Sequence, residues 1–110
     1  MTAQPVKKPL VAQVTINQPV DDPKNPVPGA NLVVSGTCDS SVTSLNVSIV
    51  NPADNIVAAS QQNVQPTNGS WSTTLTNVPS TWTDHAWNVV MATGISPSGN
   101  YTDMHRVRIA

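Results

Sequence analysis

The residue types of a hydrolytic site occur together in one short stretch of the chain. Asp84 and His85 are adjacent, and Ser80 and Thr83 lie just before them. An acid, a base and a hydroxyl nucleophile make up a serine-hydrolase triad, but triads are recognised by geometry and not by closeness in sequence. Neither hydroxyl has the glycines of a nucleophile elbow. We therefore interpret this stretch as a loop and expect no catalytic residues and no enzymatic activity.

Metal ligands are present but scattered along the chain. His85 and His105 are too few and too far apart for zinc, which takes about four closely spaced ligands. Calcium needs several oxygen ligands, and five aspartates occur in or near expected turns, although without EF-hand spacing. Solvated turn residues explain them more simply, so we expect no metal and no other cofactor. These aspartates are Asp21, Asp22, Asp39, Asp54 and Asp103.

The tryptophans indicate two different roles. Trp71 and Trp87 fall on the inward register of expected strands, which favours core packing for both. Trp82 lies instead in a link at 79–84, where an exposed indole could stack on a sugar ring or anchor an interface. The same side chain could fold back and close one end of the domain, and the sequence leaves both roles open. Trp82 is therefore a candidate partner-binding residue.

Charge and cysteine content exclude several classes of protein. Only 10% of the 110 residues are charged, and the five basic residues form no cluster that could follow a phosphate backbone. No apolar run reaches the roughly 20 residues of a membrane helix, and none follows the N-terminal lysines as in a secretory signal. We expect neither nucleic acid nor membrane as a partner. Cys38 is the single cysteine, so we expect no internal disulfide and a buried, unreactive thiol.

Hydrophobic alternation predicts an all-β chain. Short segments with period-2 alternation are separated by turn residues at intervals of about 8–12 positions, and no segment carries a helical stripe. We expect seven or eight antiparallel strands packed as an immunoglobulin-like β-sandwich. The expected strands are 10–17, 31–38, 44–51, 56–60 with an optional extension to about 64, 70–76, 85–93 and 101–110.

The parity of each strand predicts which side chains point inward. In the last strand, Arg106 and Arg108 lie on the opposite face from His105, Val107 and Ile109. We interpret the arginine pair as a solvated, aggregation-blocking edge in preference to a docking stripe. Elsewhere the expected inward residues include Leu45, Val47, Ile49, Trp71, Leu75, Trp87, Val89 and Met91.

Two regions lie outside this strand pattern. Residues 18–29 hold four prolines, too many for a central strand, and are expected to form a loop. Residues 1–9 combine prolines, lysines and small polar residues, and they cannot bury an apolar face. We expect an extended N-terminal arm at 1–9 and a single sandwich domain at 10–110. The candidate partner-binding residues of the arm are Pro5, Val6, Lys7, Lys8 and Pro9.

Four short pieces of sequence, in this order, carry a resemblance to a known family. They are Val14–Pro19 (VTINQP), Val33–Cys38 (VVSGTC), Asn68–Ser72 (NGSWS) and Ser98–Tyr101 (SGNY). Over residues 10–110 the chain resembles the bacterial and phage immunoglobulin-like (Big-type) domains found in virion accessory proteins and bacterial surface proteins. The resemblance implies a sandwich architecture. The chain lacks the antibody Cys–Trp–Cys signature, and the resemblance fixes no binding site.

These observations lead to an expected function of adhesion without chemistry. The leading hypothesis is a bacteriophage capsid decoration (cement) protein, assembled in the host cytoplasm and displayed on the virion surface. Its partner would be the major capsid protein or another virion protein, and copies of the chain could also contact one another. The first alternative is a carbohydrate-binding or adhesin module of a bacterial cell-surface protein, with Trp82 in its site. The second is a phage tail or baseplate module.

Overall fold

The computed structural model describes residues 13–52, 55–80 and 87–110. Within these residues the chain forms seven strands and no helix, and therefore no helix that could cross a membrane. Every strand pairing is antiparallel. The strands are β1 (Val14–Gln18), β2 (Leu32–Cys38), β3 (Ser44–Asn51), β4 (Ile56–Val64), β5 (Ser70–Leu75), β6 (Asn88–Ser96) and β7 (Gly99–Val107).

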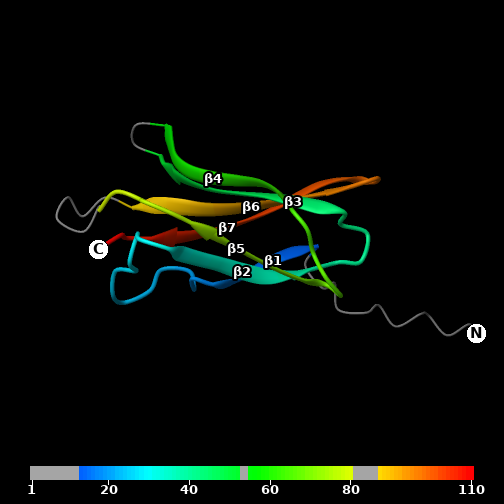
Figure 1. Ribbon diagram of the computed structural model, residues 1–110, viewed down its shortest axis with the longest axis horizontal. Coiled ribbons are helices and arrows are strands. Elements are labelled where there is room, and N and C mark those ends of the chain that lie inside the picture. Colours follow the sequence, from blue (N-terminus) through cyan, green and yellow to red (C-terminus); the bar gives the residue numbers. More distant parts are fainter. Residues whose placement is uncertain (1–12, 53–54, 81–86) are drawn as a thin grey trace, which may run out of the picture.

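The strands divide into two sheets that pack face to face (Figure 1). One sheet has the order β1-β2-β5, and the other has the order β4-β3-β6-β7. The chain crosses between the sheets after β2, after β4 and after β5, as expected for a Greek-key sandwich. The predicted fold class, an immunoglobulin-like antiparallel β-sandwich, is confirmed.

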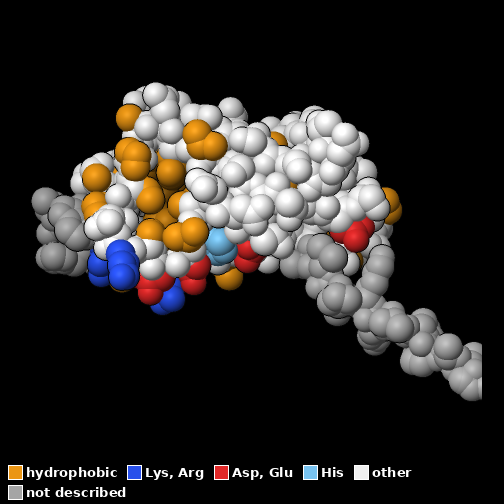
Figure 2. All heavy atoms as spheres, turned by 90° about the horizontal axis from the view of Figure 1, so that it is seen from below, with side chains coloured by type: hydrophobic (Ala, Val, Ile, Leu, Met, Phe, Trp, Pro, Cys, Tyr) orange, Lys and Arg blue, Asp and Glu red, His pale blue; other side chains and the backbone are white. Residues whose placement is uncertain are grey.

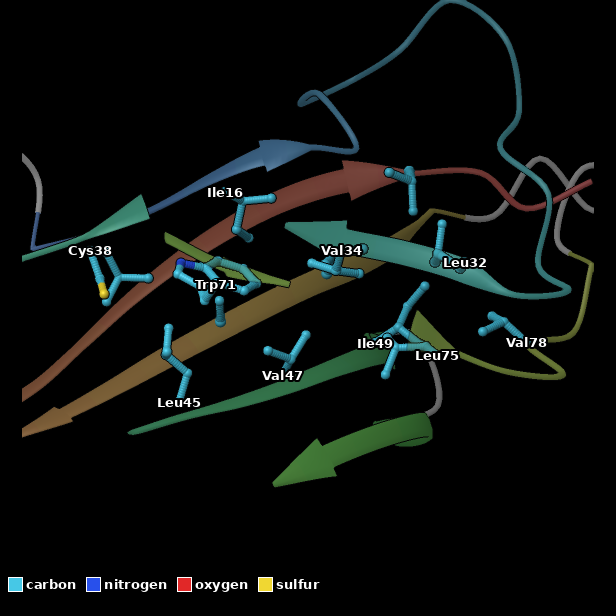
Figure 3. Packing of buried hydrophobic residues seen from close by; sticks show 14 of the residues in the cluster. Ile16, Leu32, Val34, Cys38, Leu45, Val47, Ile49, Trp71, Leu75 and Val78 are labelled. Carbon is cyan, nitrogen blue, oxygen red and sulfur yellow. The ribbon is translucent and has the colours of Figure 1, made fainter. Parts of the chain in front are cut away.

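The core is built from alternate residues of both sheets. Figure 3 shows aliphatic side chains of β2 and β3 pointing toward one another around Trp71 of β5. Trp71 is buried, and its indole Nε1–H donates a hydrogen bond to the Thr37 carbonyl at 3.0 Å. The inward positions predicted for β3 and β5 are confirmed, because Leu45, Val47, Ile49, Trp71 and Leu75 are all buried.

Turn chemistry also acts as the sequence predicts. Asn68 and Gly69 both have positive φ, at 53° and 81°, and Thr67 and Ser70 pair across them. Two successive positive φ values are the mark of a type I′ hairpin turn, for which Asn-Gly is the preferred dipeptide. The expected strand at 44–51 has the observed bounds of β3, whereas β4 continues to Val64.

The predicted orientation of β6 is wrong. Parity and size placed Trp87, Val89 and Met91 inside, but the buried residues of β6 are the alternate set that includes Val90 and Ala92. The strand also covers 88–96 and not 85–93. Both faces of this central strand are apolar, so alternation alone does not orient it. Close packing decides, because a Cβ on inward-facing Gly94 would overlap the side chains of Val14 and Val42.

The proline-rich segment after β1 forms a loop, as predicted, and it covers the open edge of β7. The Asp22 amide donates to the Arg106 carbonyl at 2.8 Å, and the Val27 amide donates to the Arg108 carbonyl at 2.9 Å. The Ala110 amide returns a hydrogen bond to the Val27 carbonyl at 2.8 Å. Edge strands expose unpaired backbone groups that can recruit other chains. This loop therefore closes one edge of the four-stranded sheet near the C-terminus.

Candidate functional site

The partner-binding residues proposed from the sequence cannot be placed in the fold. The arm, with Pro5, Val6, Lys7, Lys8 and Pro9, lies outside the described residues, and so does Trp82. Their roles therefore stay predictions.

The residues considered for hydrolysis are only partly described. Asp84, His85 and Thr83 lie outside the described residues. Ser80 is described, and its hydroxyl donates to the Ile109 carbonyl at 3.0 Å. That hydrogen bond ties the segment after β5 to the end of the chain, which is a structural role.

The described aspartates make separate, local contacts. One Asp39 carboxylate oxygen accepts the Ser41 amide at 2.9 Å, and one Asp103 oxygen accepts the Ile16 amide at 2.8 Å. Asp21 and Asp22 both lie beside Arg106. In the part of the chain that the structure describes, no three His, Cys, Asp or Glu side chains gather closely enough to hold a metal. Asp54 lies outside that part.

The outer surface of the four-stranded sheet carries an apolar patch that crosses all four strands. Val57 of β4 lies opposite Val50 of β3, and Val50 lies opposite Val89 of β6. In a neighbouring row, Met91 of β6 lies opposite Met104 of β7. Val57 and Met104 are each 57% exposed. We call this surface the contact face, and it consists of Val50, Val57, Trp87, Val89, Met91, Met104, Arg106 and Arg108.

Two arginines pack around Trp87 at one end of the contact face. Arg106 belongs to β7, and Arg108 follows just after it. The Arg108 guanidinium carbon lies 3.9 Å from the centroid of the indole ring, and that of Arg106 lies 5.9 Å away. A guanidinium over an indole is attracted by the negative face of the ring, and the contact is worth about 0.5–1 kcal/mol where exposed. The two guanidiniums therefore favour this orientation of the half-buried Trp87, which keeps part of its surface accessible.

Arg106 is anchored from the other side by the loop after β1. Its backbone amide donates to an Asp21 carboxylate oxygen at 2.7 Å, and its guanidinium lies 3.7 Å from Asp21 and 3.8 Å from Asp22. The hydrogen bond from the Arg106 amide is the main reason that the pKa of Asp21 lies below its ordinary value. The charges of Arg106 and His105 also lower the pKa of Asp21, whereas partial desolvation raises it. Asp21 and Asp22 therefore hold Arg106 in its place within the contact face.

The contact face combines the residue types that dominate protein interfaces. Trp, Met and Arg are enriched at interface cores, and Trp and Arg are the commonest residues whose truncation costs 2 kcal/mol or more. Large exposed apolar patches on a folded surface indicate sites of contact with other molecules. The interpretation of Arg106 and Arg108 as only a solvated edge is therefore incomplete, because both cations pack around an indole.

Sequence reasoning missed this face for one reason. The wrong orientation of β6 placed Trp87, Val89 and Met91 in the core and so removed them from the surface. One signal was available: the sequence correctly places Arg106 of β7, and Arg108 just after it, on the outward face. Because β6 pairs with β7, Val89, which lies opposite Arg106, faces outward together with it.

Comparison with known proteins adds no assignment to this geometry. The chain matches no protein-family model, no curated protein and no solved structure.

Proposed function

We propose that this chain is a non-enzymatic binding domain that attaches to another protein through its contact face. The observation that carries the proposal is the continuous outward row of Val57, Val50 and Val89, with Met104 exposed beside it and Trp87 fixed under Arg108. A partner that covers this row removes apolar surface from water, which stabilises a complex by about 25 cal/mol per Å² before the costs of association.

A protein partner explains the residue types of the contact face better than a glycan does. Sugar rings stack on open indole faces and need hydrogen-bonding side chains around them. At Trp87 a guanidinium lies 3.9 Å from the ring centroid and occupies one face of the indole. The neighbouring outward residues, Val89 and Met91, are apolar. This pattern favours a flat apolar surface of another protein.

The biological role that we propose is decoration of a bacteriophage capsid. A small sandwich with one apolar face is suited to many identical weak contacts, which add up on a symmetric shell through high local concentration. The major capsid protein is the partner that this role requires, and the virion surface is the location. The role rests on the resemblance of four sequence pieces to phage and bacterial immunoglobulin-like domains.

Co-sedimentation with virus particles tests the proposal. The particles come from a phage that encodes the chain, with its gene deleted, and the purified chain is added back. We expect the chain to co-sediment saturably, and Met104→Asp to weaken binding at least about tenfold, since a buried carboxylate lacks a partner there. The matched control is Thr74→Asp, at an exposed position of β5 in the other sheet. Equal binding by both variants, or no binding by the parent chain, contradicts the proposal.

A further inference from the structure

A shallow apolar groove lies on the opposite side of the sandwich, at one end of the three-stranded sheet. It has a volume of about 260 Å³ and forms where the loop after β1 passes beside the start of β2. Figure 2 shows apolar side chains gathered in this region, with charged side chains along the lower margin of the same face. The apolar residues that line the groove are Pro19, Val27, Pro28, Leu32 and Val33.

The groove also carries polar and acidic groups. Gln18 and Asn31 line it and bring side-chain amides, which donate and accept hydrogen bonds. Asp21 and Asp22 follow Pro19 closely in the same loop, and their carboxylates are about half exposed. Arg106 approaches them only to 3.7 and 3.8 Å, near the outer limit of an ion pair. Both carboxylates therefore keep capacity for a second cation.

One segment of the chain has the matching chemistry. The sequence at 5–10 is Pro-Val-Lys-Lys-Pro-Leu, with apolar side chains on either side of Lys7 and Lys8. Proline-rich segments favour an extended conformation with unpaired backbone amides and carbonyls, so they lose little entropy on docking. Apolar side chains match the groove, the lysines match Asp21 and Asp22, and the free backbone groups match Gln18 and Asn31.

We propose that residues 5–10 of one copy of this chain dock in this groove of a second copy. The direction of β1 favours the second copy over the same chain. β1 runs from Val14 toward Gln18, and Gln18 lines the groove. Val14 lies about 13 Å from Gln18 at 3.3 Å per residue, so docking in the same chain would require the backbone to reverse its direction between residues 10 and 14.

Docking of this kind joins different surfaces of the two copies. Such a head-to-tail contact builds rings when the rotation closes and open chains when it does not. The residues that line the groove belong neither to the contact face nor to the four-stranded sheet, and only Asp21 and Asp22 at its margin also contact Arg106. The docking therefore stands or falls independently of the proposed function, and it assigns a self-association site to the three-stranded sheet.

Sedimentation velocity of the full chain up to about 1 mM tests this inference, since weak contacts saturate in that range. We expect concentration-dependent association. Val33→Lys places a cation in the groove, and Lys7→Glu with Lys8→Glu reverses the charge of the arm. Each change should raise the dissociation constant at least about tenfold. The matched control, Ile56→Lys on β4, replaces a β-branched aliphatic residue of similar exposure (58% against 50% for Val33) outside both the groove and the contact face, and should leave association unchanged.

Mixing the two association-defective chains gives the sharper result. The Val33→Lys chain keeps its arm, and the Lys7→Glu/Lys8→Glu chain keeps its groove, so their mixture should form pairs that grow no further. Thermal melts of each variant, matched to the parent, separate loss of docking from loss of folding. A monomeric parent chain at about 1 mM, or association that survives both changes, overturns the inference.

Discussion

The Asp103 carboxylate of β7 accepts a hydrogen bond from the Ile16 amide of β1, with the Oδ2 and N atoms 2.8 Å apart. The two residues belong to different sheets. The same oxygen lies 3.5 Å from His105 Nε2, and His105 Nδ1 donates to the Pro19 carbonyl at 2.7 Å. A side chain of one sheet thus satisfies a backbone group at the edge of the other. This contact closes the sandwich between β1 and β7.

Asp103→Ala should destabilise the domain. It leaves the Ile16 amide without its acceptor and removes the carboxylate beside His105, and an unsatisfied, partly buried donor costs about 1–3 kcal/mol. Urea unfolding monitored by tryptophan fluorescence measures the change. Asp103→Asn is the control, because its amide oxygen can still accept the hydrogen bond and should lose less stability. Equal stability of the alanine variant and the parent contradicts this role.

Asn88→Val should stabilise the domain by about 1 kcal/mol, since it removes a buried carbonyl oxygen that accepts no hydrogen bond among the described residues. Asn88 is 2% exposed on the inward face of β6, and its Oδ1 atom has no partner among the described residues. Valine keeps a β-branched, apolar side chain next to Val107 across the strand pair. Differential scanning calorimetry should show a higher Tm. A lower Tm would show that the amide makes a contact that stabilises the fold.

Acid should loosen the loop after β1 before it unfolds the core. Hydrogen bonding from the Arg106 amide, together with nearby positive charge, lowers the pKa of Asp21 in the folded state. Because the folded pKa is lowered, ionised Asp21 contributes to stability at pH values above its unfolded pKa of about 3.9. This contribution is lost as the pH falls through the folded pKa. Hydrogen exchange, corrected for the pH dependence of the intrinsic exchange rate, should therefore show a lower protection factor for the Arg106 amide in that acidic range. In Asp21→Asn this acid-dependent step should be absent, and its persistence contradicts the assignment.

Cys38 should resist thiol reagents in the folded protein. It is buried and forms no disulfide, and desolvation, with a smaller effect of Asp39, raises the pKa of its thiol. The reactive thiolate is therefore scarce at neutral pH. The contribution of the neutral thiol to stability is lost only as the pH rises above the unfolded pKa of about 8.5. Labelling with Ellman's reagent at pH 7 should be slow in buffer and fast in urea. Rapid labelling of the native chain contradicts this picture.

Strand positions were largely readable from the sequence, because side-chain alternation and turn residues are local signals. β3 was predicted with its observed bounds, and the Asn68-Gly69 turn has the backbone geometry that this dipeptide favours. The extension of β4 to Val64 was left open by the sequence. Its register with β3 is interrupted by bulges, which break the simple alternation.

The candidate site was not readable, because it depends on the orientation of one strand. β6 has apolar residues on both faces, and its inward set includes Gly94, where the side chains of Val14 and Val42 leave no room for a Cβ. A one-residue change of parity moves every side chain to the other face of a sheet. The predicted core residues Trp87, Val89 and Met91 therefore became the surface on which the proposed function depends.

Oxidative footprinting of the particle-bound chain tests the contact face most directly. Met104 is 57% exposed in the free chain and should react readily with hydrogen peroxide, whereas a covered methionine reacts slowly. If the contact face lies against the capsid, binding should slow Met104 sulfoxide formation at least about tenfold, as measured by mass spectrometry of the pelleted particles. An unchanged Met104 oxidation rate in chain that is demonstrably bound would show that another surface makes the contact.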